Sequence, residues 1–134
     1  MRIMLDTNVL ISMVFFPGKR FMQMLEFISR RHTLVLSSFV IEELMCVADR
    51  KFPTRKSAID RFLTNLGYEF VYTPHRIPAG IFEIRDNKDY PVLYTAIIEN
   101  VDILITGDKD LADVDIEKPE ILTPSEFIEK YIQL

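Results

Sequence analysis

Apolar and polar positions along the chain follow two different periods, and together they predict strands separated by helices. Short apolar runs, typical of buried strands, occupy residues 2–6, 33–37, 69–72 and 102–106, with a shorter edge candidate at 121–123. Apolar residues recur at the i, i+3, i+4, i+7 spacing of amphipathic helices in 20–30, 39–48, 54–66, 92–97 and 127–131. This alternation predicts a parallel sheet with helices on both faces. The expected fold class is α/β, a three-layer α/β/α sandwich around a central, mostly parallel sheet of four to five strands.

The composition is that of an ordinary globular protein, and it restricts the structural classes to which the chain can belong. With 134 residues, of which 49% are hydrophobic and 27% charged, the chain is expected to form a single domain over 1–134. Its longest apolar stretch, 9–16, is too short to cross a bilayer, and the first residues carry no targeting pattern. We therefore expect a cytoplasmic protein without a membrane partner. The single cysteine, Cys46, cannot form an internal disulfide and is expected to be buried.

Acidic residues follow two of the predicted strands. Asp6 ends the first apolar run, and Asp108 follows the run at 102–106 after Thr106 and a glycine. If these strands lie side by side, both carboxylates reach one edge of the sheet, where open α/β sheets bind ligands. Carboxylates held together repel each other and raise a pKa, and a divalent metal is the simplest way to keep both ionised. For either segment alone, helix capping or a turn explains the acid equally well.

Further acids lie at the other predicted strand-to-helix junctions. Glu43 precedes Leu44 on the core-facing stripe of its helix, so it is expected to point inward, although an acid this early also complements the helix dipole. Asp86 and Asp89 flank the start of the helix at 92–97, and capping alone would account for Asp89. Capping does not explain why so many acids gather at these junctions.

The chain resembles the PIN-domain nucleases in four motifs that occur in the family's order. They are Leu5-Asp6-Thr7-Asn8-Val9-Leu10, Ser38 to Glu43-Leu44, Asp86-x-x-Asp89, and Thr106-Gly107-Asp108-Lys109-Asp110-Leu111. The resemblance runs from residue 2 to about 124. It is strongest to the single-domain toxin components of toxin–antitoxin pairs, which are related to the VapC ribonucleases.

The resemblance implies a set of site residues. The catalytic, metal-binding acids would be Asp6, Glu43, Asp89 and Asp108, with Asp110 as an accessory metal ligand. Asn8, Thr106 and Asp86 would support these carboxylates by hydrogen bonds, although Asp86 and Asp89 could exchange roles. Carboxylates without a His or Cys cluster are hard oxygen ligands, which suit Mg²⁺ or Mn²⁺.

The activity implied is metal-dependent endoribonuclease cleavage of phosphodiester bonds in single-stranded RNA by a toxin. Its partners would be the RNA, a cognate antitoxin protein and a second copy in a homodimer. Phe39, Phe52 and Phe62 are expected to form the exposed protein-binding surface. The acids alone would also suit a DNA nuclease, whereas a haloacid-dehalogenase-like phosphatase would need an acid at Asn8. The alternative from another class is a non-catalytic PIN-like module that binds protein or RNA.

Overall fold

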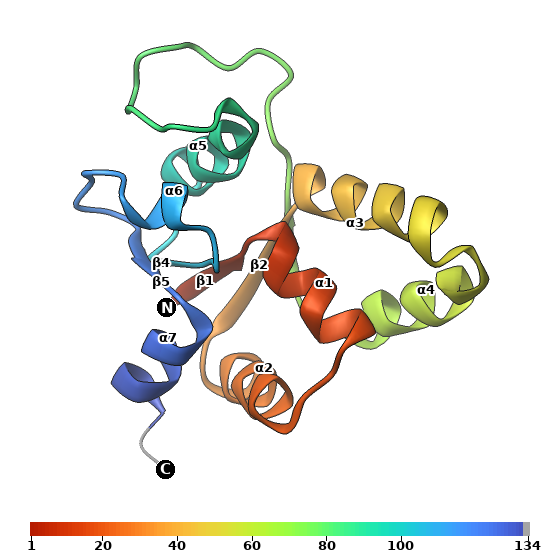
Figure 1. The fold of residues 1–134 in the computed structure, drawn as a ribbon. Helices are drawn as coiled ribbons and strands as arrows, with labels where there is room; N and C mark the ends of the chain where they lie inside the picture. The colour runs from red at the N-terminus through yellow and green to blue at the C-terminus, as the bar shows by residue number, and fades with distance from the viewer. Residues whose placement is uncertain (133–134) are drawn as a thin grey trace.

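A five-stranded sheet forms the centre of the computed structural model, which describes residues 1–132 (Figure 1). The strands are β1 (Arg2–Leu5), β2 (Thr33–Ser37), β3 (Glu69–Val71), β4 (Ile103–Ile105) and β5 (Glu120–Leu122). They lie in the order β3-β2-β1-β4-β5, and every neighbouring pair is parallel. The α/β prediction is confirmed, including the edge strand, and the sheet is parallel throughout.

Helices connect the strands and cover the sheet. They are α1 (Thr7–Phe15), α2 (Lys19–Arg31), α3 (Ser38–Lys51), α4 (Lys56–Asn65), α5 (Tyr90–Ile98), α6 (Lys109–Ala112) and α7 (Pro124–Tyr131), with short 3₁₀ turns η1 (Pro53–Arg55) and η2 (Asn87–Asp89). Crossovers between parallel strands are right-handed almost without exception. The connections from β1 outward to β3 therefore lie on one face, and those from β3 back to β5 lie on the other. Figure 1 shows α1 to α4 to one side of the strands, with α5 and α6 to the other.

The central strands are buried on both faces, which explains why they are continuous apolar runs and not alternating ones. In β1, β2 and β4 the buried apolar residues are Ile3, Met4, Leu5, Leu34, Val35, Leu36, Ile103, Leu104 and Ile105. The helices add further buried residues, such as the stripe Val40, Leu44 and Ala48 of α3. No helix within residues 1–132 combines the length and the apolar character that a membrane crossing requires.

Two expectations about side-chain exposure are wrong. Cys46 is exposed, because it lies two positions from Leu44 and so faces away from the buried stripe of α3. Phe39, Phe52 and Phe62 are half-buried and pack against the core; they are not an exposed surface. Phe52, for example, stacks on Phe15 with ring centroids 4.3 Å apart.

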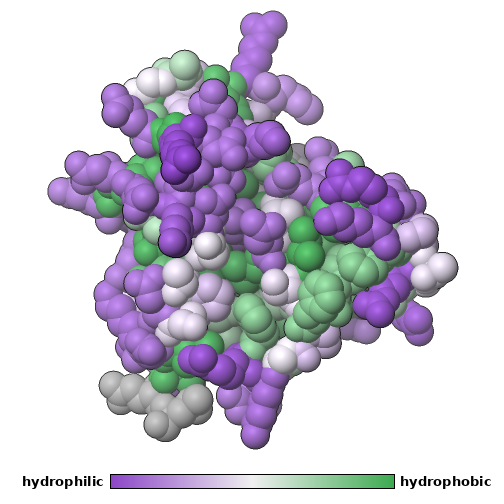
Figure 2. All heavy atoms as spheres, viewed as in Figure 1, coloured by the Kyte–Doolittle hydropathy of each residue, from purple (hydrophilic) through white to green (hydrophobic). Residues whose placement is uncertain are grey.

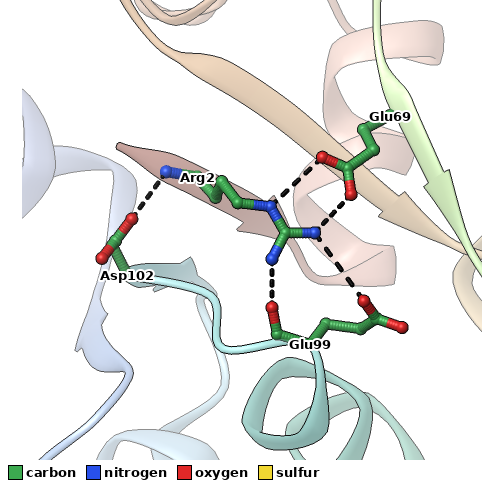
Figure 3. Close-up of polar contacts among 4 residues, drawn as sticks. All are labelled: Arg2, Glu69, Glu99 and Asp102. Atoms are coloured by element: carbon green, nitrogen blue, oxygen red, sulfur yellow. Dashed lines mark hydrogen bonds and ion pairs between the residues drawn. The ribbon is translucent and has the colours of Figure 1, made fainter.

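A polar cluster joins the amino-terminal ends of the strands (Figure 3). The Arg2 guanidinium donates to both carboxylate oxygens of Glu69 in β3 and to the backbone oxygen of Glu99 after α5. The Arg2 backbone N–H donates to Asp102 Oδ2 at 2.7 Å, just before β4. These contacts link β1 to β3 and to the α5–β4 connection, at the end of the sheet opposite to Asp6.

Candidate active site

The carboxyl ends of β1 and β4 form the point at which the sheet changes its direction of winding. The two strands are neighbours, but the chain leaves β1 toward β2 and leaves β4 toward β5, on the other side. Such a switch point leaves a crevice above the strand ends, where open α/β sheets bind ligands. Asp6 directly follows β1, and its backbone N–H donates to Ile105 O in β4 at 3.0 Å.

Asp6 is buried at this edge of the sheet, with 4% of its surface exposed. Its Oδ1 accepts from the Thr7 backbone N–H, and its Oδ2 accepts from Thr106 Oγ1, both at 2.7 Å. Burial raises the pKa of Asp6, the two hydrogen bonds oppose this rise, and the nearby charge of Asp108 adds to it. The hydrogen bond that the PIN-domain resemblance implied for Thr106 is therefore made to Asp6.

Glu43 is brought to Asp6 by a residue that sequence reasoning missed. Thr7 Oγ1 donates to Glu43 Oε1 at 2.6 Å, which joins the start of α1 to α3. Glu43 is half-buried, and this burial raises its pKa against the effect of the Thr7 hydrogen bond, with a smaller rise from Asp6. The inward orientation predicted for Glu43 is confirmed. The sequence signal that could have identified Thr7 is its position directly after Asp6, the first acid of the site.

Three more acids meet one another, and one of them, Asp89, lies near Asp6. Asp86, Asp89 and Asp110 each present an oxygen within 4.8 Å of the other two. Asp89 Oδ2 is buried and has no hydrogen-bond partner. Burial, followed by contact with Asp108, raises the pKa of Asp89 to about 7. Although Asp89 occupies the N-cap position of α5, its side chain makes no capping hydrogen bond, so capping does not account for it.

Asp108 completes the group and does combine a capping role with proximity to the other acids. Its Oδ1 accepts from the Asp110 backbone N–H at 2.8 Å at the start of α6, and its own N–H donates to Thr106 Oγ1 at 3.0 Å. Its charge raises the pKa values of Asp6 and Asp89. Asp108 is therefore a capping residue that also lies close to Asp6 and Asp89.

The PIN domain family profile matches residues 2–110 of the chain. The chain belongs to the PIN domain family. Among solved structures it is similar to a chain of the crystal structure of VapBC2 from Rickettsia felis bound to a DNA fragment from their promoter. The TM-score is 0.70 and the identity 22%, over 91% of this chain and 97% of that chain. At this identity the likeness shows a shared fold. A comparison with curated protein sequences gives no significant match.

Six carboxyl groups make up the acidic site of this PIN domain. We use this name for Asp6, Glu43, Asp86, Asp89, Asp108 and Asp110. Among the described residues, none of the six forms an ion pair with a Lys or Arg. Figure 2 shows hydrophilic residues gathered over α6 and the start of α5, whereas apolar residues are visible over α1.

A hard divalent cation fits this arrangement. The donors are all carboxylate oxygens, which Mg²⁺ and Mn²⁺ prefer. Asp89 has a buried oxygen without a partner. Burial, followed by contact with Asp108 and by the charges of Asp108, Asp6 and Asp86, raises the pKa of this carboxyl, as expected for a partly buried acid that lacks a counterion. Asn8 differs from its predicted role. It is exposed, and in the part of the chain that the structure describes its side chain makes no hydrogen bond to these acids.

Proposed function

We propose that this PIN domain is a metal-dependent endoribonuclease that hydrolyses phosphodiester bonds of single-stranded RNA. The observation that carries the proposal is the acidic site itself. Six carboxylates from four regions of the chain, near the starts of α1, α3, α5 and α6, gather near the switch point of the sheet. Within residues 1–132 none of them has a basic partner, and one Asp89 oxygen is buried without a hydrogen bond. Leaving such a group unpaired costs free energy, so a cation-dependent role explains its presence better than a structural one.

The proposed roles follow from the position of each side chain. Asp6, Glu43, Asp89, Asp108 and Asp110 would hold Mg²⁺ or Mn²⁺. When bound, such a cation supplies charge neutralisation at the phosphate and activation of water. Asp86, which has a carboxylate oxygen within 4.8 Å of oxygens of Asp89 and Asp110, would support these two ligands.

Two threonines would keep the carboxylates in place. Thr106 donates to Asp6 while accepting from the Asp108 N–H, so its hydroxyl proton is directed at Asp6. The Thr7 hydroxyl likewise donates to Glu43 Oε1. Each hydrogen bond uses one lone pair of a carboxylate oxygen and leaves others free for a cation.

We further propose that the protein is the toxin of a toxin–antitoxin pair, with a cognate antitoxin protein as its partner. Membership of the PIN family and the likeness in fold to a chain of the VapBC2 complex support this choice. The homodimer and the cytoplasmic location expected from the sequence stay predictions.

Cleavage of labelled single-stranded RNA by variants tests the catalytic proposal. Asp6→Asn and Asp108→Asn keep the size of the side chain but remove its charge, so each should lower the rate by about 10²-fold or more while circular dichroism shows an intact fold. Glu43→Gln and Asp89→Asn should do almost as much damage. Chelation by EDTA should abolish cleavage, and added Mg²⁺ or Mn²⁺ should restore it.

Asp113→Asn and Asp115→Asn provide matched controls, because both residues are exposed acids in the segment that follows α6. They should cleave like the wild type. Wild-type rates from folded Asp6→Asn protein would place the activity elsewhere. Absence of cleavage by the wild type, across metals and pH, would favour the non-catalytic binding module.

A further inference from the structure

A cavity of about 560 Å³ lies between the end of the β3–α5 loop and the start of α5. This loop is the long green segment that joins the two elements in Figure 1. The residues that line the cavity include Gly80, Phe82, Glu83, Arg85, Asn87 and Tyr90. We call it the loop pocket.

The chain itself ties the loop pocket to the acidic site. Arg85 and Asn87 immediately flank Asp86, and Tyr90 immediately follows Asp89. The wall of the pocket and two of the clustered carboxylates therefore belong to the same short stretch of chain, residues 85–90. If one unit of an extended polymer binds at the acidic site, a neighbouring unit of the same polymer can enter the loop pocket.

Tyr90 holds the pocket in shape. Its ring stacks on Phe82, with centroids 4.2 Å apart and planes 17° from parallel. Its hydroxyl donates to Pro78 O at 3.0 Å and accepts from the Ile81 N–H at 3.1 Å. Two backbone hydrogen bonds and one aromatic contact thus fasten the loop to α5. The cavity is preformed, which lowers the entropic cost of binding.

The chemistry of the walls suits a nucleobase better than a phosphate. A base has flat apolar faces, which stack on aromatic rings, and an edge of donors and acceptors. The pocket offers aromatic rings together with a carboxylate (Glu83), a guanidinium (Arg85) and an amide (Asn87). Glu83 and the nearby acidic site would repel a phosphate inside the cavity. The volume falls within the range of about 300–1,000 Å³ that is usual for small-ligand pockets.

We propose that the loop pocket binds one nucleobase of the RNA, next to the phosphodiester bond cleaved at the acidic site, and so helps to select the cleavage position. This inference rests on the proposed ribonuclease function, because it takes the same RNA as its ligand. Arg85 and Asn87 then act as specificity residues, while the Phe82–Tyr90 pair provides the aromatic wall.

Variants of exposed pocket residues test the inference without disturbing the core. Arg85→Gln and Asn87→Ala should weaken RNA binding about tenfold, with the effect larger in KM than in kcat. Sequencing of the products from a random RNA pool should show an altered base preference at one position near the cut. Arg76→Gln is the matched control, because Arg76 is exposed on the same loop but does not line the pocket.

A second measurement separates this inference from the proposed function. Binding of short RNA homopolymers of A, C, G and U is followed in EDTA, where no metal-dependent cleavage occurs. If the wild type cleaves RNA but both variants keep its KM and base preference, the inference is overturned and the function stands. If the wild type cleaves nothing, yet binds one homopolymer preferentially and both variants lose this preference, the function fails and the base pocket is supported. No base preference in binding or cleavage overturns the inference.

Discussion

Replacing Asp89 by asparagine removes a carboxyl whose pKa rises from its ordinary value of 3.8 to about 7. This pKa is raised because Asp89 is partly buried, contacts Asp108, and lies near the charges of Asp6 and Asp86. Asparagine has nearly the same shape but does not titrate. The substitution therefore separates the electrostatic cost of this one carboxyl from the packing around it.

The sign of the effect follows from proton linkage. Below about pH 4, Asp89 is protonated in both the folded and the unfolded protein, so its ionisation costs nothing. As the pH rises from 4 to 7, the unfolded chain releases this proton first, and the free energy of unfolding falls. Above about pH 7 the folded protein bears the full cost of the ionised group. The metal-free protein should therefore lose stability over this range.

The magnitude can be bounded. At about 1.4 kcal/mol per tenfold change in proton affinity, a pKa moved from 3.8 to about 7 corresponds to roughly 4 kcal/mol at most. Asp89 is only partly buried and shares its environment with three other acids, so solvent screening reduces this value. We expect a cost of about 2 kcal/mol at pH 8 and about half of that at pH 5.

Urea denaturation in EDTA, followed by circular dichroism at pH 5 and pH 8, measures this cost. Asp89→Asn should be about 2 kcal/mol more stable than the wild type at pH 8, and the difference should shrink at pH 5. Asp113→Asn is the control, because it removes the same charge from an exposed position and should follow the wild-type pH dependence. Parallel pH profiles for Asp89→Asn and the wild type would refute the reasoning.

Three further predictions address the rest of the molecule. Mg²⁺ or Mn²⁺ at millimolar concentration should raise the Tm of the wild type, because a ligand that binds only the folded state stabilises that state. Asp108→Asn should stabilise the metal-free protein and remove this response to metal. An unchanged Tm of the wild type would count against the site. Thr7→Val and Thr106→Val should lower RNA cleavage about 10- to 100-fold in folded protein, because the carboxylates lose their orienting donors; rates equal to the wild type would contradict this role. Arg2→Gln should lower the free energy of unfolding by about 1 kcal/mol, since its partner Glu69 is 42% exposed, and should leave the cleavage rate unchanged.

Much of the fold could be predicted from the chain because strands and helices leave local periodic signals. The segment 33–37 coincides with β2, and the other predicted strands agree with the observed ones to within one residue at each end. The four-residue helix α6 was not predicted, because so short an element cannot display a helical period. The burial of Cys46 was predicted wrongly, because apolar neighbours in sequence do not specify which face of a helix a residue occupies.

The sequence by itself determined which acids lie at strand-to-helix junctions, because an acid that ends an apolar run can be recognised from the few residues around it. Only the tertiary structure decided which of them meet. The order β3-β2-β1-β4-β5 makes β1 and β4 neighbours, and this places Asp6 beside Thr106 across one hundred residues of chain. The Thr7–Glu43 hydrogen bond and the orphaned oxygen of Asp89 likewise depend on how α1, α3 and α5 pack. Local periodicity encodes burial, whereas proximity between distant segments is a property of the whole sheet.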